Sequence, residues 1–385
     1  MVAPAWVHSF AWAKPRVGLS LELGPELDTN PARVTGDDLD QSYAGSRQTA
    51  APLLRVVGHG ELSLRLGKHL FTLGYGGGGK LYLSDVGRLA DELVQLARAG
   101  WNARLSPSVA FGVVGRYYDA FLREPEDCNT PEIPCPPRRD FRSFDGGLEL
   151  GVMALPGLRA LARVGYSGLE FKPTAAFSFH SGFLGLELRG DTSTGLGDAI
   201  VDWSISASYR AAARRFGGLA QIPAPCGDAG SDECAIDSEE QRWDLSHRMR
   251  LEGGYLGAAE LRLWYAVDIN RSNSFGESFL RHGVGIRYTT VLVWDVYLTV
   301  TGVLQFSRFA DPLYARLASQ AFVDIEAENR SRLVLHLGRD LGAGWSVSLR
   351  HSLYVNESAT TSEGRPLPGF LRQTLFCGLR YEYGT

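Results

Sequence analysis

The sequence has few lysines and no long hydrophobic run. Lys14, Lys68, Lys80 and Lys172 are its only lysines, so arginine supplies the other 35 of its 39 basic residues. No stretch approaches the roughly 18 consecutive apolar residues of a transmembrane helix, which excludes a helical membrane protein. The formal net charge of −4 shows no basic excess, which argues against a nucleic-acid-binding protein. These observations do not exclude a membrane protein built from β-strands, because the hydropathy of alternating strands averages out along the sequence.

The dominant pattern is an alternation of apolar and polar residues with a period of two, which is typical of β-strands. In residues 16–24, for example, every second residue from Val17 is apolar. Residues 86–97 also fit a short amphipathic helix, which competes with the strand predicted over 93–105. Sixteen segments are predicted as strands: 16–24, 53–66, 69–77, 93–105, 109–121, 143–155, 158–169, 177–190, 199–211, 242–255, 259–268, 279–289, 291–307, 330–338, 345–355 and 370–383.

The predicted connections alternate in length. Short turns, such as Gly67-Lys68 and a single Thr290, follow the even-numbered strands. Long links, such as 122–142 and 212–241, follow most odd-numbered strands, and the link 191–198 is a partial exception on the short side. An up-and-down barrel that crosses an outer membrane has this arrangement, with short periplasmic turns and long extracellular loops.

Two physical constraints favour a closed barrel. In lipid every backbone donor and acceptor must be paired within the protein, so a span built from strands has to close. The charged alternate positions need water, so we expect a polar inner face around an aqueous lumen. The predicted fold is therefore all-β: an antiparallel up-and-down transmembrane β-barrel of about 16 strands over residues 16–385, preceded by an N-terminal periplasmic tail over residues 1–15.

The outer face should then be apolar, with aromatic side chains near the membrane boundary, where amphipathic rings are favoured. The aromatic residues on the predicted apolar faces are Trp101, Tyr166, Trp203, Tyr209, Trp294, Trp345, Tyr381 and Tyr383.

The predicted inner face carries arginines interleaved with acids. A GC-rich genome explains the abundance of arginine as well as a lumen lined with permanently charged guanidinium groups does, and both explanations can hold. Ion pairs across strands would rigidify the wall, whereas unpaired arginines would favour anionic solutes. The candidate lumen-lining residues are Arg98, Arg104, Arg163, Arg248, Arg250, Arg262, Arg281, Arg287, Arg332, Arg350, Arg372, Arg380, Glu149, Asp202, Asp244, Glu252, Glu260 and Asp295.

Four of the five cysteines form two close pairs in polar segments rich in proline and glycine. We expect one disulfide between Cys128 and Cys135 and another between Cys226 and Cys234, which would place both loops in an oxidising compartment. Neither pair has the spacing of a zinc site and no histidine lies nearby, so no metal site is predicted. Cys377 stands alone in an apolar alternation and is interpreted as a small packing residue.

No phosphate loop, zinc spacing or paired-carboxylate site is present. A hydrolase embedded in the membrane would need a Ser/His pair on its lipid-facing side, and the predicted apolar faces do carry His247, His282 and His351. The adjacent residues His351 and Ser352, however, would point to opposite faces of one strand. We therefore expect neither an enzyme nor a cofactor.

The end of the last predicted strand, G-L-R-Y-E-Y, resembles the C-terminal insertion signal of outer-membrane barrels. In that signal a glycine is followed three and five residues later by aromatic or apolar residues, here Gly378, Tyr381 and Tyr383. The chain departs from the pattern in continuing through Gly384 and Thr385. The architectural resemblance to Gram-negative outer-membrane barrels covers nearly the whole chain.

The first predicted strand and its exit, LELGPELDTNPARV, resemble the G-x-x-x-D-x-N opening of barrels attached to tetratricopeptide-repeat domains. Gly24, Asp28 and Asn30 carry this likeness. Barrels of that kind include surface lipoprotein assembly modifiers and exopolysaccharide-export barrels.

These resemblances imply a protein of the outer membrane of a Gram-negative bacterium, inserted by the barrel-insertion machinery. The expected partners are outer-membrane lipids and that machinery, with no nucleic acid. The expected function is a channel or export conduit, porin-like or of the polysaccharide-secretion type. The alternative is a structural or assembly component of a cell-envelope machine without free solute passage, which would add periplasmic or envelope-complex proteins as partners.

Overall fold

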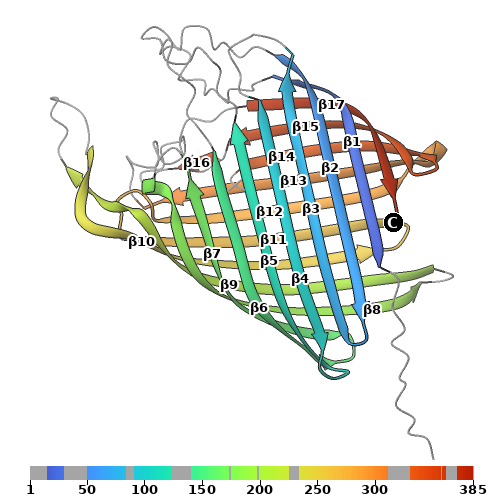
Figure 1. The fold of residues 1–385 in the computed structure, drawn as a ribbon, viewed down its shortest axis with the longest axis horizontal. Coiled ribbons are helices and arrows are strands. Elements are labelled where there is room, and N and C mark those ends of the chain that lie inside the picture. Colours follow the sequence, from blue (N-terminus) through green and yellow to red (C-terminus); the bar gives the residue numbers. More distant parts are fainter. Residues whose placement is uncertain are drawn as a thin grey trace, which may run out of the picture.

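The computed structural model describes residues 15–29, 50–83, 91–122, 140–172, 175–196, 199–224, 234–310, 330–356, 358–360 and 371–384. Within these ranges sixteen long antiparallel strands form a closed barrel (Figure 1). None of the helical turns in the described part of the chain is long and apolar enough to cross a membrane.

Each long strand pairs with its neighbour in the sequence, and the last strand pairs with the first. The wall consists of β1 (Arg16–Asp28), β2 (Ala51–Leu66), β3 (His69–Tyr82), β4 (Glu92–Arg104), β5 (Val109–Leu122), β6 (Phe141–Leu155), β7 (Leu158–Phe171), β8 (Phe179–Leu196), β9 (Ala199–Ala224), β10 (Cys234–Leu256), β11 (Ala259–Ser272), β12 (Phe279–Val291), β13 (Val296–Phe309), β14 (Arg330–Gly342), β15 (Trp345–Asn356) and β17 (Leu371–Tyr383). The three-residue strand β16 (Ser358–Thr360) pairs in parallel with residues 306–308, near the C-terminal end of β13.

The sixteen predicted strands and the alternation of connection lengths are confirmed. Residues 92–104 form β4, so the strand prevails over the competing helix. The exception expected at 191–198 is wrong, because β8 continues to Leu196 and pairs there with Ala199 of β9. Every described turn on one side of the barrel is therefore short.

The long link predicted over 212–241 is also wrong. Strand β9 continues to Ala224, and β10 begins at Cys234, so the two form a hairpin that extends beyond neighbouring strands (Figure 1). Two irregularities in the pairing lie between Asp237 and Trp243. Beyond the apolar band both faces of a hairpin can meet water, so the sequence loses its period of two there.

The turn predicted at Thr290 alone lies a few residues further along. The backbone reverses at Trp294 and Asp295, whose φ angles of 59° and 56° are both left-handed. Two central residues with positive φ make the tight turn that matches the twist of a hairpin. Trp294 and Asp295 therefore lie in a turn, and Asp295 does not belong to the wall of the barrel.

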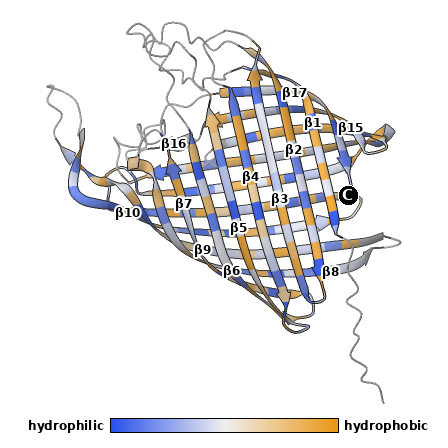
Figure 2. Ribbon diagram, in the orientation of Figure 1, coloured by the Kyte–Doolittle hydropathy of each residue, from blue (hydrophilic) through white to orange (hydrophobic). Residues whose placement is uncertain are grey.

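Cross-strand registers divide the wall into two faces. One row of directly paired residues runs from Leu19 through Gly60, Tyr75 and Ala97 to Tyr117, and it is apolar. Large side chains on this face are half exposed, as expected for a surface that contacts lipid. The alternate positions carry charged side chains that pair across strands, so hydrophobic and hydrophilic bands alternate along each strand (Figure 2).

The barrel closes where β1 meets β17, and the two backbones approach closely there. A Cβ atom at Gly24 would lie 2.0 Å from the carbonyl oxygen of Cys377 and 2.6 Å from the Cα of Gly378. The next residue, Pro25, has no N–H to donate, and the pairing with β17 skips both Gly24 and Pro25. Glycine at position 24 is thus required by the space between the first and last strands.

We expect Gly24→Ala to destabilise the barrel by about 3 kcal/mol or more, because the added methyl group overlaps backbone atoms that cannot move aside. The measurement is urea-induced unfolding in lipid vesicles, followed by tryptophan fluorescence. The control is Gly18→Ala in the same strand, where nothing lies within 4 Å of an added Cβ. Equal stabilities of the two variants would contradict this account of closure.

Candidate functional site

The candidate site is the polar inner face of the barrel. The strand registers place all of the predicted lumen-lining residues on this face except Asp295. Because side chains alternate along each strand, their placement follows from the parity of their positions.

Most of these arginines have a carboxylate partner. Along β10, β11 and β12, Arg248 lies 2.5 Å from Asp268, and Arg250 lies 2.6 Å from Glu252. The guanidinium of Arg250 also stacks over the ring of Trp264, 4.6 Å from its centroid. Charge pairs and rings together hold these arginines against the wall.

A denser cluster lies on β6, β7 and β9. Asp145 accepts a hydrogen bond of 2.6 Å from Arg163, and its other oxygen lies 3.4 Å from Arg210. Arg163 also lies 3.4 Å from Glu149. Both arginines stack on the buried ring of Phe183, at 5.2 Å and 4.0 Å from its centroid.

Elsewhere on the inner face, Arg98 of β4 donates to Glu61 of β2 at 2.5 Å and contacts the Nε2 atom of His59 at 3.1 Å. To do so it lies across Gly74 of β3, where a Cβ atom would meet its side chain at 2.4 Å. A glycine on the intervening strand thus allows a charge pair between strands that are not neighbours.

Some arginines of the inner face have no carboxylate partner among the described residues, and they include Arg104, Arg116, Arg287 and Arg332. Arg116 was not among the predicted lumen-lining residues, although its register opposite Arg98 puts it on the same face; Arg104, Arg287 and Arg332 were. Among the described residues, most of the predicted inner-face arginines are thus ion-paired and a smaller number have no carboxylate partner.

The charge pairs at the closing strands were only half predicted. Arg372 donates through Nε to both oxygens of the buried Asp28 at 3.0 Å, and Arg350 donates to Glu22 at 2.9 Å. The arginines of both pairs were predicted, but Asp28 and Glu22 were not assigned to the lumen. Both acids occupy even-numbered positions in β1, whereas its leucines occupy odd-numbered ones, so the alternation could have assigned the acids to the inner face.

Glu26 completes this group on β1. Its two oxygens accept hydrogen bonds from Arg55 of β2 at 3.0 Å and from Lys80 of β3 at 2.8 Å. The side chain of Glu26 is nearly fully buried. Charges on β1 thus link strands on both sides of the closure.

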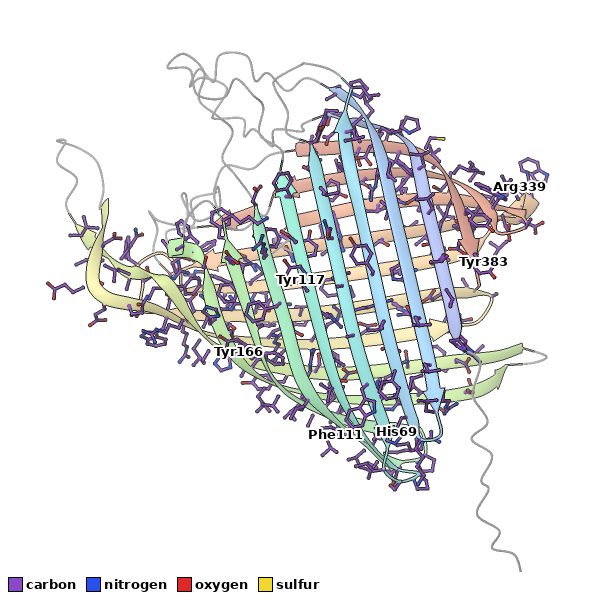
Figure 3. All side chains as sticks on the ribbon, viewed as in Figure 1. His69, Phe111, Tyr117, Tyr166, Arg339 and Tyr383 are labelled. Carbon is purple, nitrogen blue, oxygen red and sulfur yellow. The ribbon has the colours of Figure 1, made fainter. Side chains whose placement is uncertain are left out.

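The outer-face aromatic residues expected from the sequence lie on the apolar side of the wall, except for Trp294 in its turn. Figure 3 labels Tyr166 and Tyr383 among the side chains of the barrel surface. Trp203 and Trp345 lie near the short-turn ends of β9 and β15, and both are more than 40% exposed.

The three histidines expected on the apolar face each have a partner other than serine. Nδ1 of His247 lies 2.7 Å from the hydroxyl of Tyr209, and Nδ1 of His282 lies 2.7 Å from that of Tyr265. His351 contacts Gln373 at 3.4 Å. None of these three contacts forms the Ser/His pair considered from the sequence.

Of the four cysteines in the two predicted disulfides, the described residues include only one. Cys128, Cys135 and Cys226 lie outside the described residues, and Cys234 is the first residue of β10. Cys377 is a free, exposed cysteine of β17. The described part of the chain brings together no group of three metal-ligating side chains. The two disulfides stay predictions.

The chain was compared with known proteins, and no family model and no curated protein matches it. Solved structures do. CdiB from Acinetobacter baumannii is 10% identical with a TM-score of 0.46, over 96% of this chain and 60% of that one. OprB from Pseudomonas putida is 10% identical with a TM-score of 0.45, over 96% and 94%. The outer membrane protein OpdK from Pseudomonas aeruginosa is 11% identical with a TM-score of 0.41, over 95% and 99%.

These likenesses concern the fold alone, since the identities are near one residue in ten. The chain spans only 60% of the length of CdiB, whereas it spans nearly all of OprB and OpdK.

We expect Asp28→Asn to lower the free energy of unfolding by about 3–5 kcal/mol, because it leaves the guanidinium of Arg372 buried without its counter-charge. Urea-induced unfolding in lipid vesicles checks this. The control is Arg189→Gln, which breaks an exposed ion pair with Asp191 and should change stability by less than about 1 kcal/mol. A loss as small for Asp28→Asn as for the control would show that the buried pair does not stabilise the closure.

Proposed function

We propose that this protein is a porin-like channel of the outer membrane of a Gram-negative bacterium. The observation that carries the proposal is a closed barrel of sixteen long strands with an apolar outer face and a charged inner face. Barrels of 16 to 18 strands are wide enough to leave an aqueous channel. A charged inner face is costly in a dry core and stable in a hydrated one.

Placement in a membrane is supported by the outer surface. Its exposed leucines form a band around the wall, and aromatic side chains such as Trp101 and Tyr381 lie toward the short-turn ends of their strands. Such rings favour the boundary between acyl chains and headgroups. The short turns would then be periplasmic and the long connections extracellular, which puts the expected N-terminal tail, residues 1–15, in the periplasm.

Insertion by the barrel-insertion machinery is part of the proposal. The side chains of Tyr381 and Tyr383, which carry the likeness to the insertion signal, lie on the apolar face, paired in register with Leu21 and Leu19. Gly378 lies against β1, where a Cβ atom would come within 3.2 Å of the carbonyl oxygen of Leu23. The signal residues thus belong to the strand that closes the barrel.

The finer likeness, to barrels attached to tetratricopeptide-repeat proteins, does not favour an assembly component over a channel. Of its three residues, Gly24 makes room for β17 and Asp28 binds Arg372. Asn30 lies outside the described residues. Closure of the barrel accounts for the two described residues, and every membrane barrel needs closure.

The solutes that we propose are small anions. Arg104, Arg116, Arg287 and Arg332 carry positive charge without a carboxylate partner in the described part of the wall. A lumen lined by excess charge of one sign raises the local concentration of the opposite ion.

Conductance of the purified full chain in planar lipid bilayers tests the channel. We expect steps of steady conductance, and a reversal potential in a potassium chloride gradient that indicates preference for chloride. A barrel that inserts but conducts no ions would contradict the proposal.

We expect the double variant Arg116→Gln with Arg287→Gln to lower the ratio of chloride to potassium permeability by about twofold or more, since two unpaired charges leave the lumen. The control is Arg339→Gln, a charge on the outer face of β14 (Figure 3), which should leave the ratio unchanged. Equal ratios for the double variant and the control would show that these arginines do not select ions.

A further inference from the structure

The outer face carries one repeated pair of rings. Three consecutive hairpins carry the same tyrosine–histidine pair: Tyr166 with His180, Tyr209 with His247, and Tyr265 with His282. The rings stack at 5.9, 6.0 and 6.1 Å between centroids, with interplanar angles of 13°, 21° and 24°.

The register of the three pairs is identical. Each tyrosine lies on an odd-numbered strand and faces, on the next strand, the residue two positions after the histidine: Gly182, Met249 and Val284. A random scatter of rings would not repeat one diagonal offset in β7–β8, β9–β10 and β11–β12. The repeat places the three histidines on the outer face, above the tyrosines and toward the long connections.

An outer-face arginine lies on each of the odd-numbered strands β9, β11 and β13, which alternate with the strands that carry the histidines. Arg215 of β9 lies directly opposite His180, Arg271 is the penultimate residue of β11, and Arg308 is the penultimate residue of β13. All three are exposed. We call His180, Arg215, His247, Arg271, His282 and Arg308 the His/Arg band.

The arginines of the His/Arg band have no carboxylate partner within the described ranges. Basic residues at the same end of the outer face on β5–β7 are different. There Arg142 lies 3.6 Å from Asp119, and Lys172 donates to Asp119 at 2.8 Å. Arg142 and Lys172 are thus neutralised by an acid of the outer face, whereas Arg215, Arg271 and Arg308 have no such partner among the described residues.

The tyrosines prepare the histidines to donate. When the hydroxyl of Tyr209 or Tyr265 donates to Nδ1, the neutral imidazole carries its proton on Nε2. His247 and His282 then offer an N–H on the same face as Arg271 and Arg308, each of which lies on the adjacent strand two residues beyond the residue directly opposite the histidine. N–H donors and guanidinium forks set side by side form the arrangement that binds phosphate.

From this geometry we infer that the His/Arg band binds the phosphate groups of a phosphorylated glycolipid in the outer leaflet around the barrel. The acyl chains would lie on the exposed apolar side chains below the band, for example Leu186, Met249 and Leu251, which line an open apolar depression of about 570 Å³. Charge complementarity above and apolar surface below match the two ends of such a lipid. This inference rests on the proposed location in the outer membrane, and it is independent of conduction.

The test measures binding of bisphosphorylated lipid A to the full chain in detergent micelles by native mass spectrometry, beside dephosphorylated lipid A and phosphatidylcholine. We expect wild-type protein to retain the bisphosphorylated form at least several-fold better than the other two. The triple variant Arg215→Gln, Arg271→Gln, Arg308→Gln should weaken that binding on the order of tenfold or more, because each cation near a membrane surface contributes to anionic lipid binding.

The matched control is the double variant Arg142→Gln with Lys172→Gln, which removes neutralised cations and should change binding by less than about twofold. Heat-modifiable migration in gels confirms that each variant is folded. The inference is overturned if wild-type protein binds the three lipids equally or if the triple variant binds as well as the control. Conductance is measured on the same samples: a closed barrel that still selects lipid A would refute the channel and leave the band standing.

Discussion

The pairing of every backbone hydrogen bond is the constraint on which the structure depends. A strand-built wall in lipid has no solvent to satisfy an open edge, so the first and last strands must meet. The chain meets this demand at β1 and β17 with two glycines in close approach and with charge pairs, one buried and one partly buried, that link residues more than 300 positions apart. The contacts that close the barrel thus join the two ends of the chain directly.

The strands were predictable because the two sides of the wall face different media. Wherever lipid lies on one side of a strand and water on the other, apolar and polar residues alternate with a period of two, as they do from Val17 through β1. Prediction failed where that difference ends. The β9–β10 hairpin extends past the apolar band, and the turn at Trp294 and Asp295 depends on two left-handed backbone conformations that side-chain patterning does not encode.

The sequence alternation predicted which side chains lie on the inner face, but it did not predict which carboxylate each arginine would bind. Arg98 and Arg350 lie where alternation put them, yet their partners Glu61 and Glu22 belong to strands two positions away around the barrel. Such pairs require registers of three strands at once. The aromatic residues under the arginines were missed for another reason, because Phe183 and Trp264 are large rings on a face where alternation favours polar residues.

Joining the two ends of the chain also governs how the molecule can be made. Most contacts of the wall join consecutive strands, whereas the contact between Asp28 and Arg372 spans 344 positions and can form only when both ends of the chain are present. No partial barrel can seal its edges before β17 arrives. A chain that lacks β17 would expose unpaired strand edges, which favour aggregation, so we expect closure to depend on the whole length being present.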